Sequence, residues 1–353
     1  MAYSSIVKPT DYFNTKLYTG NDTDDHAITG VNFQPDFVWI KSRSVANNHN
    51  LYDVIRGVNK PLKSNSTASE FTRTDALKSF DSDGFTLDDD ATSDEVNNNG
   101  VTYASWNWLA GGTASSNSDG SITSTVSANT TAGFSIVSYT GTGSNATVGH
   151  GLGSAPKVVI VKTRDAARDW TVYHGGISNM ASGYIILNAT DAFSTAFSTN
   201  WNNTNPTSSV FSVGTANTSN NLNSNYIGYC FAEKKGFSNF GSYTGNGNAD
   251  GAFVYTGFKP AWLMVKRTDD TQDWRIFDNI RSPFNLMTNQ LKANTSDAEG
   301  TSADFFDFTS NGFKIRKSSD AINASGGTYI YMVFAENPFV GNDSGTAVPV
   351  VAR

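Results

Sequence analysis

The chain has 353 residues, 38% of them hydrophobic and 16% charged, and a formal net charge of −7. Its apolar runs fall short of the roughly 20 residues of a membrane-spanning helix, its first residues carry no Sec-type signal pattern, and its acidic charge provides no basic field for a phosphate backbone. We therefore expect no membrane insertion and no nucleic-acid partner.

The polar residues predict an all-β fold. Asp outnumbers Glu by 27 to 5, and Asn outnumbers Gln by 37 to 3. The short member of each pair hydrogen-bonds the backbone locally and favours turns, whereas the long member favours helices. Together with 31 Gly and 23 Phe, this composition indicates strands joined by many turns. Helix is expected only in short pieces, such as residues 74–80.

Three copies of one pattern follow each other along the chain. Each copy opens with Tyr-Thr-Gly, a proline follows the tyrosine by 17 residues, and the proline begins an apolar run that ends in lysine. The tyrosines are Tyr18, Tyr139 and Tyr243, the prolines are Pro35, Pro156 and Pro260, and the lysines are Lys41, Lys162 and Lys266. The pattern predicts three homologous units.

Two further strands are expected in the later part of each unit. The first alternates apolar and polar residues with the period of two that a half-buried strand shows. The alternating pairs are Phe85/Leu87, Phe211/Val213 and Phe313/Ile315, and the last strands begin at Tyr103, Tyr226 and Tyr329. The run from Tyr329 to Ala335 is apolar on both faces, which predicts a central strand covered on both sides.

The spacing of these landmarks predicts three tandem antiparallel β-sandwich or jelly-roll-like units with long, turn-rich loops. The expected parts are an N-terminal arm (1–10), the first unit (11–112), a Ser/Thr/Gly-rich linker or edge hairpin (113–132), the second unit (133–236), the third unit (237–340) and an extended C-terminal tail (341–353). Within the linker, residues 121–127 have the pattern of an extra edge strand.

A polar–aromatic dipeptide recurs as Asp169-Trp170 and Asp273-Trp274. Each tryptophan lies eight residues beyond the lysine of its apolar run, and we assign Leu51 to that place in the first unit, after a two-residue insertion. The pattern is typical of a core tryptophan beside a turn aspartate, which we favour. The alternative is a platform on which a sugar ring stacks, so these four residues are the candidate ligand-binding residues.

A carboxylate and a guanidinium also recur three residues apart. The pairs are Asp53/Arg56 and Asp278/Arg281, with His174 and Ile177 in their places in the second unit. We predict structural ion pairs, although such a pair could also clamp a polar ligand.

No catalytic pattern stands out. HExxH, G-x-S-x-G and phosphate-binding glycine loops are missing, and Glu233 and Glu336 stand singly instead of as the paired carboxylates of a glycosidase. Cys230, the single cysteine, excludes a disulfide framework and is expected to be a buried packing residue. We predict no catalytic residue, no cofactor and no metal site. The acidic turns at 22–25 and 88–90 leave calcium open but lack EF-hand spacing.

Three stretches resemble a known family. They are residues 30–41 (Gly-Val-Asn-Phe-Gln-Pro-Asp-Phe-Val-Trp-Ile-Lys), 80–85 (Phe-Asp-Ser-Asp-Gly-Phe) and 331–339 (Tyr-Met-Val-Phe-Ala-Glu-Asn-Pro-Phe). They resemble a β-rich repeat domain of tailed bacteriophages, especially those of marine bacteria, whose members are described as virion structural or tail-fibre-like proteins. The resemblance implies a virion protein made in the host bacterial cytoplasm, and it provides no catalytic residues.

Our first hypothesis is therefore a non-enzymatic virion protein on an appendage, a tail fibre or tail-associated, that contacts host-surface glycans. One alternative is a capsid-attached decoration or knob protein that stabilises the particle, and another is a polysaccharide-degrading tail protein. The expected partners are other virion proteins and further copies of this chain, because virion appendages are symmetric assemblies. Three internal units could also build a pseudo-threefold body within one chain.

Overall fold

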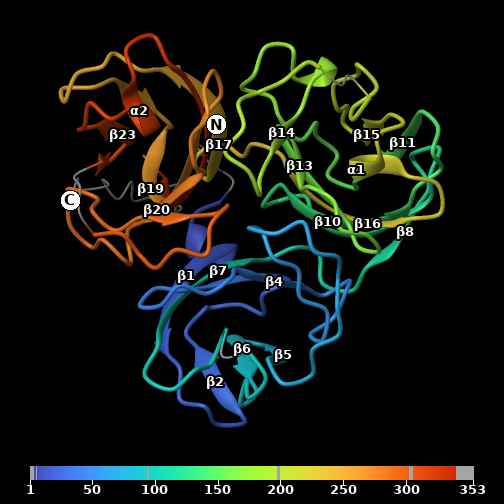
Figure 1. Cartoon of the computed structure of the whole chain (residues 1–353), viewed down its shortest axis with the longest axis horizontal. Coiled ribbons are helices and arrows are strands. Elements are labelled where there is room, and N and C mark those ends of the chain that lie inside the picture. The colour runs from blue at the N-terminus through green and yellow to red at the C-terminus, as the bar shows by residue number, and fades with distance from the viewer. Residues whose placement is uncertain (1–3, 5, 94, 197–198, 302–304, 339–353) are drawn as a thin grey trace.

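The computed structural model describes residues 4, 6–93, 95–196, 199–301 and 305–338. These residues form the all-β protein that the composition predicts, with strands paired antiparallel in several sheets (Figure 1). In the described residues, helix is limited to α1 (Asn217–Asn220), α2 (Asp320–Asn323) and the 3-10 turns η1 (Pro9–Asp11) and η2 (Met180–Ser182).

Each unit consists of a main sheet and a small sheet. In the first unit the main sheet has the order β1 (Phe13–Thr19), β7 (Thr102–Trp108), β3 (Phe37–Ser42), β4 (Asn50–Asp53), and the small sheet has the order β2 (His26–Thr29), β6 (Gly84–Leu87), β5 (Leu77–Asp81). In the second unit the main sheet has the order β14 (Ile185–Ile186), β13 (Thr171–His174), β12 (Val158–Thr163), β16 (Asn225–Phe231), β10 (Phe134–Thr140), β9 (Ser124–Asn129), β8 (Ser115–Asn117), and β11 (Ala146–Gly149) pairs with β15 (Val210–Val213). In the third unit the main sheet has the order β17 (Ser238–Thr244), β24 (Thr328–Pro338), β19 (Phe258–Arg267), β20 (Arg275–Asp278), β21 (Leu291–Lys292), and the small sheet has the order β18 (Phe253–Tyr255), β23 (Gly312–Ile315), β22 (Phe306–Thr309).

The three units surround one shared core (Figure 1). Each main sheet turns one face to its own small sheet and the other face to the centre of the body. In β24, Ile330, Met332 and Phe334 belong to the central core, whereas Tyr329 and Tyr331 belong to the core beneath the small sheet. The prediction of a last strand covered on both sides is confirmed, and β7 and β16 repeat the arrangement.

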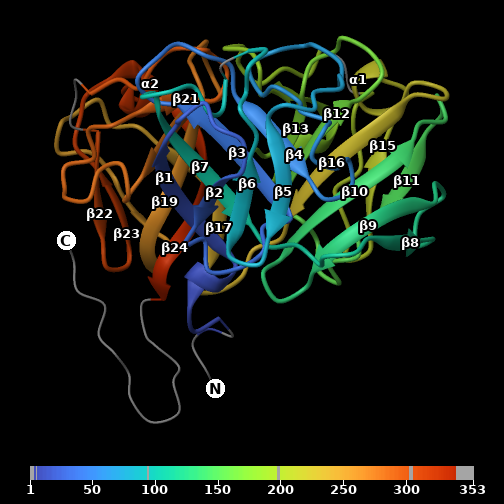
Figure 2. The same cartoon turned by 90° about the horizontal axis from the view of Figure 1, so that it is seen from below.

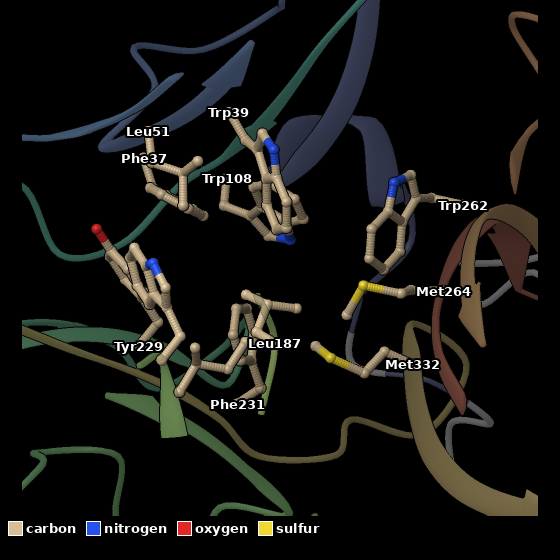
Figure 3. Close-up of a pocket in the computed structure, with 12 residues that line it drawn as sticks. Phe37, Trp39, Leu51, Trp108, Leu187, Tyr229, Phe231, Trp262, Met264 and Met332 are labelled. Carbon is tan, nitrogen blue, oxygen red and sulfur yellow. The ribbon is translucent and has the colours of Figure 1, made fainter. Parts of the chain in front are cut away.

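Aromatic rings from all three units fill the centre (Figure 3). The ring centroids of Trp108, Trp262 and Phe334 lie 5.8 Å from one another, and Trp108 also meets Phe231 of the second unit at 6.4 Å. The void between the rings measures about 10 Å³, which is no more than a single water molecule needs. The centre is therefore a packed core and offers no space for a ligand.

Each Tyr-Thr-Gly motif makes the same contact within its unit. The motif tyrosine stacks on the tyrosine near the start of the last strand. The stacked pairs are Tyr18/Tyr103, Tyr139/Tyr226 and Tyr243/Tyr329, with ring centroids 5.0, 5.1 and 4.9 Å apart. A Cβ atom on the motif glycine would lie 2.3 Å from a carbonyl oxygen of the loop before that strand, at Gly20, Gly141 and Gly245 alike. The motif thus holds the first strand of the unit against its last.

A buried asparagine, which sequence reasoning missed, completes this contact. Its Oδ1 accepts a hydrogen bond from the backbone N–H that follows the motif glycine, at 3.1, 2.7 and 2.9 Å in the three units. Its Nδ2 donates to two carbonyl oxygens. These residues are Asn97, Asn220 and Asn323, each 0% exposed. They satisfy backbone groups that would otherwise be buried without partners.

Two sequence-based assignments are wrong. Residues 74–80 do not form a helix, because Leu77 begins β5, which pairs with β6 and packs in the small-sheet core; tertiary pairing here overrides local preference. The extra strand expected at residues 121–127 is present as β9, but its expected place at the edge is wrong, because β9 lies between β10 and β8.

The segment 113–132 is thus the edge hairpin of the two alternatives, since β8 and β9 extend the main sheet of the second unit. Ile6 of the N-terminal arm packs in the central core. Figure 2 shows α1 and α2 at one end of the body and the first described residues at the other. The expected extended tail, 341–353, lies outside the described residues.

We predict that Gly141→Ala destabilises the protein, because its methyl group would lie 2.3 Å from the carbonyl oxygen of Asn221. Such overpacking costs about 1–3 kcal/mol, to be measured as the free energy of unfolding in urea. Gly228→Ala is the matched control, since its Cβ would meet no atom closer than 3.7 Å. Equal stability of the two variants would contradict the proposed role of the motif glycine.

Candidate functional site

Trp170 and Trp274 are core residues whose indole N–H groups cross to a neighbouring unit. They are 0% and 2% exposed. Nε1 of Trp170 donates to the carbonyl oxygen of Lys63 at 2.9 Å, and Nε1 of Trp274 donates to that of Ile186 at 2.8 Å. Neither indole has a face free for a ligand. The alternative of a sugar-stacking platform at Asp169-Trp170 and Asp273-Trp274 is therefore wrong, and the two rings serve packing.

The aspartate before each tryptophan is engaged by the turn of its own unit. Asn188 donates its side-chain N–H to Asp169 at 2.8 Å and accepts the backbone N–H of Trp170 at 2.7 Å. The corresponding residues of the third unit are Asn294, Asp273 and Trp274, with both distances 2.8 Å. Each asparagine therefore fixes the backbone beside the buried indole.

In the first unit the position of these tryptophans belongs to His49, and the assignment to Leu51 is wrong. His49 lies eight residues beyond the lysine of the apolar run without any insertion, and its backbone N–H donates to Asn65 Oδ1 at 3.1 Å. Its Nδ1 accepts from the indole of Trp39 at 2.8 Å, and its Nε2 lies 2.9 Å from the carbonyl oxygen of Lys292. Burial lowers the pKa of His49, which keeps the imidazole neutral.

These contacts run in one direction around the body. Side chains of the first unit contact carbonyl oxygens of the third, those of the second contact the first, and those of the third contact the second. We call the unit that provides the carbonyl oxygens the preceding unit. The lysine that ends each apolar run follows the same rule, and all three lysines are 0% exposed. Nζ donates to a carbonyl oxygen of the preceding unit: Lys41 to Ser296 at 3.3 Å, Lys162 to Thr67 at 3.2 Å and Lys266 to Thr190 at 3.1 Å. Burial lowers the pKa of each lysine to about 8.

Two of the three interfaces also contain a buried network of two arginines and two carboxylates. Between the first and second units, Arg56 Nε lies 2.6 Å from Asp53 Oδ2, and Arg164 donates to both oxygens of Glu70 at 2.8 and 3.0 Å. Between the third and first units the corresponding pairs are Arg281/Asp278 at 2.5 Å and Arg43/Glu299 at 3.1 and 2.8 Å.

An aromatic donor from the adjacent unit completes each network. The hydroxyl of Tyr229 donates to Asp53 Oδ2 at 2.8 Å, and Nε1 of Trp106 donates to Asp278 Oδ2 at 3.1 Å. The side chains of Asp53, Arg56, Asp278 and Arg281 are all 0% exposed. A polar ligand therefore has no access to them, and their charges hold the units together.

Among the described residues, the interface between the second and third units has no such network. His174 occupies the place of the aspartates, and its Nε2 lies 3.1 Å from the carbonyl oxygen of Tyr331. Burial lowers the pKa of His174 to about 4, so the imidazole is neutral at physiological pH. Ile177, Phe193 and Thr268 stand where the other interfaces have an arginine, a glutamate and a second arginine. This interface is therefore uncharged at these positions.

Cys230 and several aspartates of the acidic turns are also held in structural contacts. Cys230 is 0% exposed, and burial raises the pKa of its thiol. In the acidic turns, Asp24 and Asp25 lie 2.5 and 2.8 Å from Lys78 Nζ, and Asp90 pairs with Arg73. Within the part of the chain that the structure describes, no three His, Cys, Asp or Glu side chains gather in an arrangement that could hold a metal ion.

The sequence reasoning missed the outer arginine–glutamate pair of each network. A signal was available, because Arg43 and Arg164 each lie two residues beyond the repeated lysine. Glu70 and Glu299 are also two of only 5 glutamates in the chain, so their positions are informative. Glu70 and Glu299 are separated from their arginine partners in another unit by 94 and 256 residues, so the pairs leave no local pattern in the sequence.

Together, the sheets and interfaces define a single-chain β-protein of three homologous units closed around a pseudo-threefold axis (Figure 1). The chain belongs to the family described as domain of unknown function DUF7483, whose model matches residues 8–338 and so spans all three units. Comparison with curated proteins and with solved structures finds no match. Among the described residues, no helix is long and apolar enough to cross a membrane.

We predict that Lys162→Met flattens the pH dependence of stability. The pKa of Lys162 is about 8 in the folded protein and 10.5 when unperturbed. The unfolded chain therefore binds more protons between these pH values, and this lysine makes the free energy of unfolding rise with pH across the window. Loss of the lysine should lower the slope by on the order of 1 kcal/mol per pH unit, measured by urea unfolding between pH 8 and 10.

The exposed Lys157→Met is the control for this measurement and should leave the slope unchanged. Cys230 and the buried tyrosines titrate in the same pH range and change the free energy of unfolding in the opposite direction. Subtracting the free energy of unfolding of each variant from that of the wild type at every pH removes their contribution. A slope that Lys162→Met leaves unaltered would contradict the role of burial at this lysine.

We predict that Asp278→Ala costs about 3 kcal/mol or more, because it leaves the guanidinium of Arg281 buried without its nearest carboxylate. The control is Asp11→Ala, whose partner Lys8 and own side chain are 61% and 47% exposed; its effect should stay within about 0.5 kcal/mol. Thermal or urea unfolding measures both. A loss below about 1 kcal/mol for Asp278→Ala would refute the dependence of the buried Arg281 on its pairing with Asp278.

Proposed function

We propose that the protein is a non-enzymatic structural component of a bacteriophage virion, carried on a tail appendage where it contacts glycans of the host surface. The observation that carries the proposal is the closed three-unit body. Three main sheets share one aromatic core, and buried donors of every unit reach carbonyl oxygens of the preceding one. Such a rigid body suits a particle that must survive outside the cell and that presents variable loops to a partner.

The pseudo-threefold axis adds support for a place on a symmetric appendage. Virion appendages are symmetric assemblies, and a single chain of three homologous units presents similar surfaces about one axis. It can therefore meet a threefold-symmetric neighbour with all of its units. Other virion proteins, and further copies of this chain, are the partners that this geometry favours.

The isolated carboxylates favour a structural role over the degradation of polysaccharide. Glu233 accepts the backbone N–H of Phe240 at 2.9 Å, and Glu336 accepts the side-chain N–H of Asn279 at 2.6 Å and lies 3.4 Å from Lys259 Nζ. A glycosidase needs two carboxyl groups that face each other across the substrate. Glu233 of the second unit is instead engaged with β17 of the third unit, and Glu336 with two residues of its own unit.

We predict that gold-labelled antibodies against the protein decorate the tails of intact particles. The purified protein should also compete with the phage for adsorption to host cells. Labelling confined to the capsid would overturn the tail location and favour a decoration protein. Release of new reducing ends from host polysaccharide by the purified protein would contradict the non-enzymatic role.

A further inference from the structure

A cleft lies at the interface between the second and third units, at the place where the other two interfaces have their arginine–carboxylate networks. Its volume is about 490 Å³, within the roughly 300–1,000 Å³ of ligand sites. The second unit contributes the segment after β13, and the third unit contributes the ends of β17 and β19 and the start of β24. The residues that matter here are Ile177, Ser178, Phe193, Thr244, Thr268 and Asp269.

The backbone around the cleft has the same hydrogen bond as the two interfaces that contain an arginine–carboxylate network. We call these two the closed interfaces. The N–H of Phe193 donates to the carbonyl oxygen of Thr268 at 2.8 Å. The corresponding bonds join Glu70 to Arg164 and Glu299 to Arg43, also at 2.8 Å. The side chains alone therefore explain the difference: where two long guanidinium groups and a carboxylate fill the closed interfaces, Ile177, Phe193 and Thr268 leave space.

The walls of the cleft suit an uncharged ligand rich in hydroxyl groups. The exposed residues Ser178, Ser242 and Thr244 bring hydroxyls to it, and the half-buried Ile177 and Phe193 bring apolar surface on which the C–H face of a sugar ring can pack. This combination of polar groups with an apolar platform is typical of small-ligand sites.

The cleft also contains one carboxylate, Asp269. Asp269 is held by Arg267 at 3.0 Å and by the backbone N–H of Thr328 at 3.0 Å, and the hydrogen bond from Arg267 lowers the pKa of Asp269. It is therefore ionised at neutral pH and paired through both oxygens with Arg267, at 3.0 and 3.2 Å, and its remaining lone pairs can accept hydrogen bonds from hydroxyl groups. No lysine or arginine is among the described residues that line the cleft. A uronate or phosphate group would therefore find no cationic partner among these lining residues.

A second cleft adjoins the first across Ile177 and Ser178, which line both. Its volume is about 520 Å³, and its walls include Asn203 and Asn205. The amide oxygen of Asn205 accepts the hydroxyl of Tyr173 at 2.8 Å, which orients the amide. Tyr243 and Tyr329 line the first cleft and donate their hydroxyls to carbonyl oxygens of α2, so the first cleft lies close to α2.

We propose that the cleft between the second and third units binds a short neutral oligosaccharide. This inference rests on the proposed function and names the site and the class of glycan for it. The pseudo-threefold body then has one binding interface and two closed ones, so the ligand breaks the symmetry of the three units.

The test uses the full-length chain on an array that carries neutral hexose and N-acetylhexosamine oligosaccharides beside uronate-containing ones. Thr244→Trp places an indole in the cleft, and the double variant Phe193→Glu/Thr268→Arg rebuilds the pair of the closed interfaces. We expect the wild type to bind neutral glycans and both variants to bind them at least tenfold more weakly. Thr140→Trp, at the equivalent position of the second unit beside a closed interface, should bind as the wild type does.

Thermal unfolding of every variant shows that it is folded, and the double variant supports the test if the indole in Thr244→Trp disturbs folding. Binding that survives in both variants, or that Thr140→Trp abolishes equally, would overturn the assigned site. A wild type that binds no glycan, or only the uronate-containing ones, would overturn the ligand class. Either result leaves the tail location to be decided by the gold labelling, so failure of this inference is distinguishable from failure of the proposed function.

Discussion

Each main sheet has two apolar faces, and the small sheet of its own unit covers only one of them. The other face of the third unit carries Trp262, Met264, Met332 and Phe334 among others. Burying each large apolar side chain contributes roughly 1.5–3 kcal/mol. The free-energy cost of exposing a whole face is therefore comparable with the ~5–15 kcal/mol that stabilises an entire domain. We therefore expect a single unit to be unstable by itself and the three units to fold as one body.

The direction of the contacts explains why three units suffice. Every interface joins one surface of a unit to a different surface of the preceding unit, which is a head-to-tail contact, and such contacts end only when the rotation closes. Closure after three units gives two carbonyl oxygens at each interface a donor, one from a lysine and one from a ring N–H. Because unpartnered buried backbone groups are costly, the donors specify the order of the units as well as their stability.

The features that repeat with a fixed spacing were predictable, and those that join distant units were not. Aromatic landmarks revealed the three units and the strands β6, β15 and β23. The assignment of Leu51 failed because it matched the apolar character of the tryptophans and ignored their spacing from the lysine. The structure keeps that spacing and places His49 where the other units have a tryptophan. Like the tryptophans, His49 donates its backbone N–H to an asparagine side chain and has a ring nitrogen beside a carbonyl oxygen of the preceding unit. The ion networks stayed hidden because charge pairs between units leave no period in the sequence. The cleft arises because one interface lacks the arginine and glutamate side chains of the network, and no sequence motif indicates such an absence.

The uncharged third interface is consistent with the physics of buried ions. Moving charges out of water is costly, and a buried network often adds little net stability over apolar residues of similar volume. An interface can therefore lose its network without losing closure, provided the core and the carbonyl contacts remain. Both remain between the second and third units, where Trp274 and Lys266 still reach Ile186 and Thr190. Removing the network costs the body little, and the volume that the guanidinium groups would occupy becomes surface that a ligand can use.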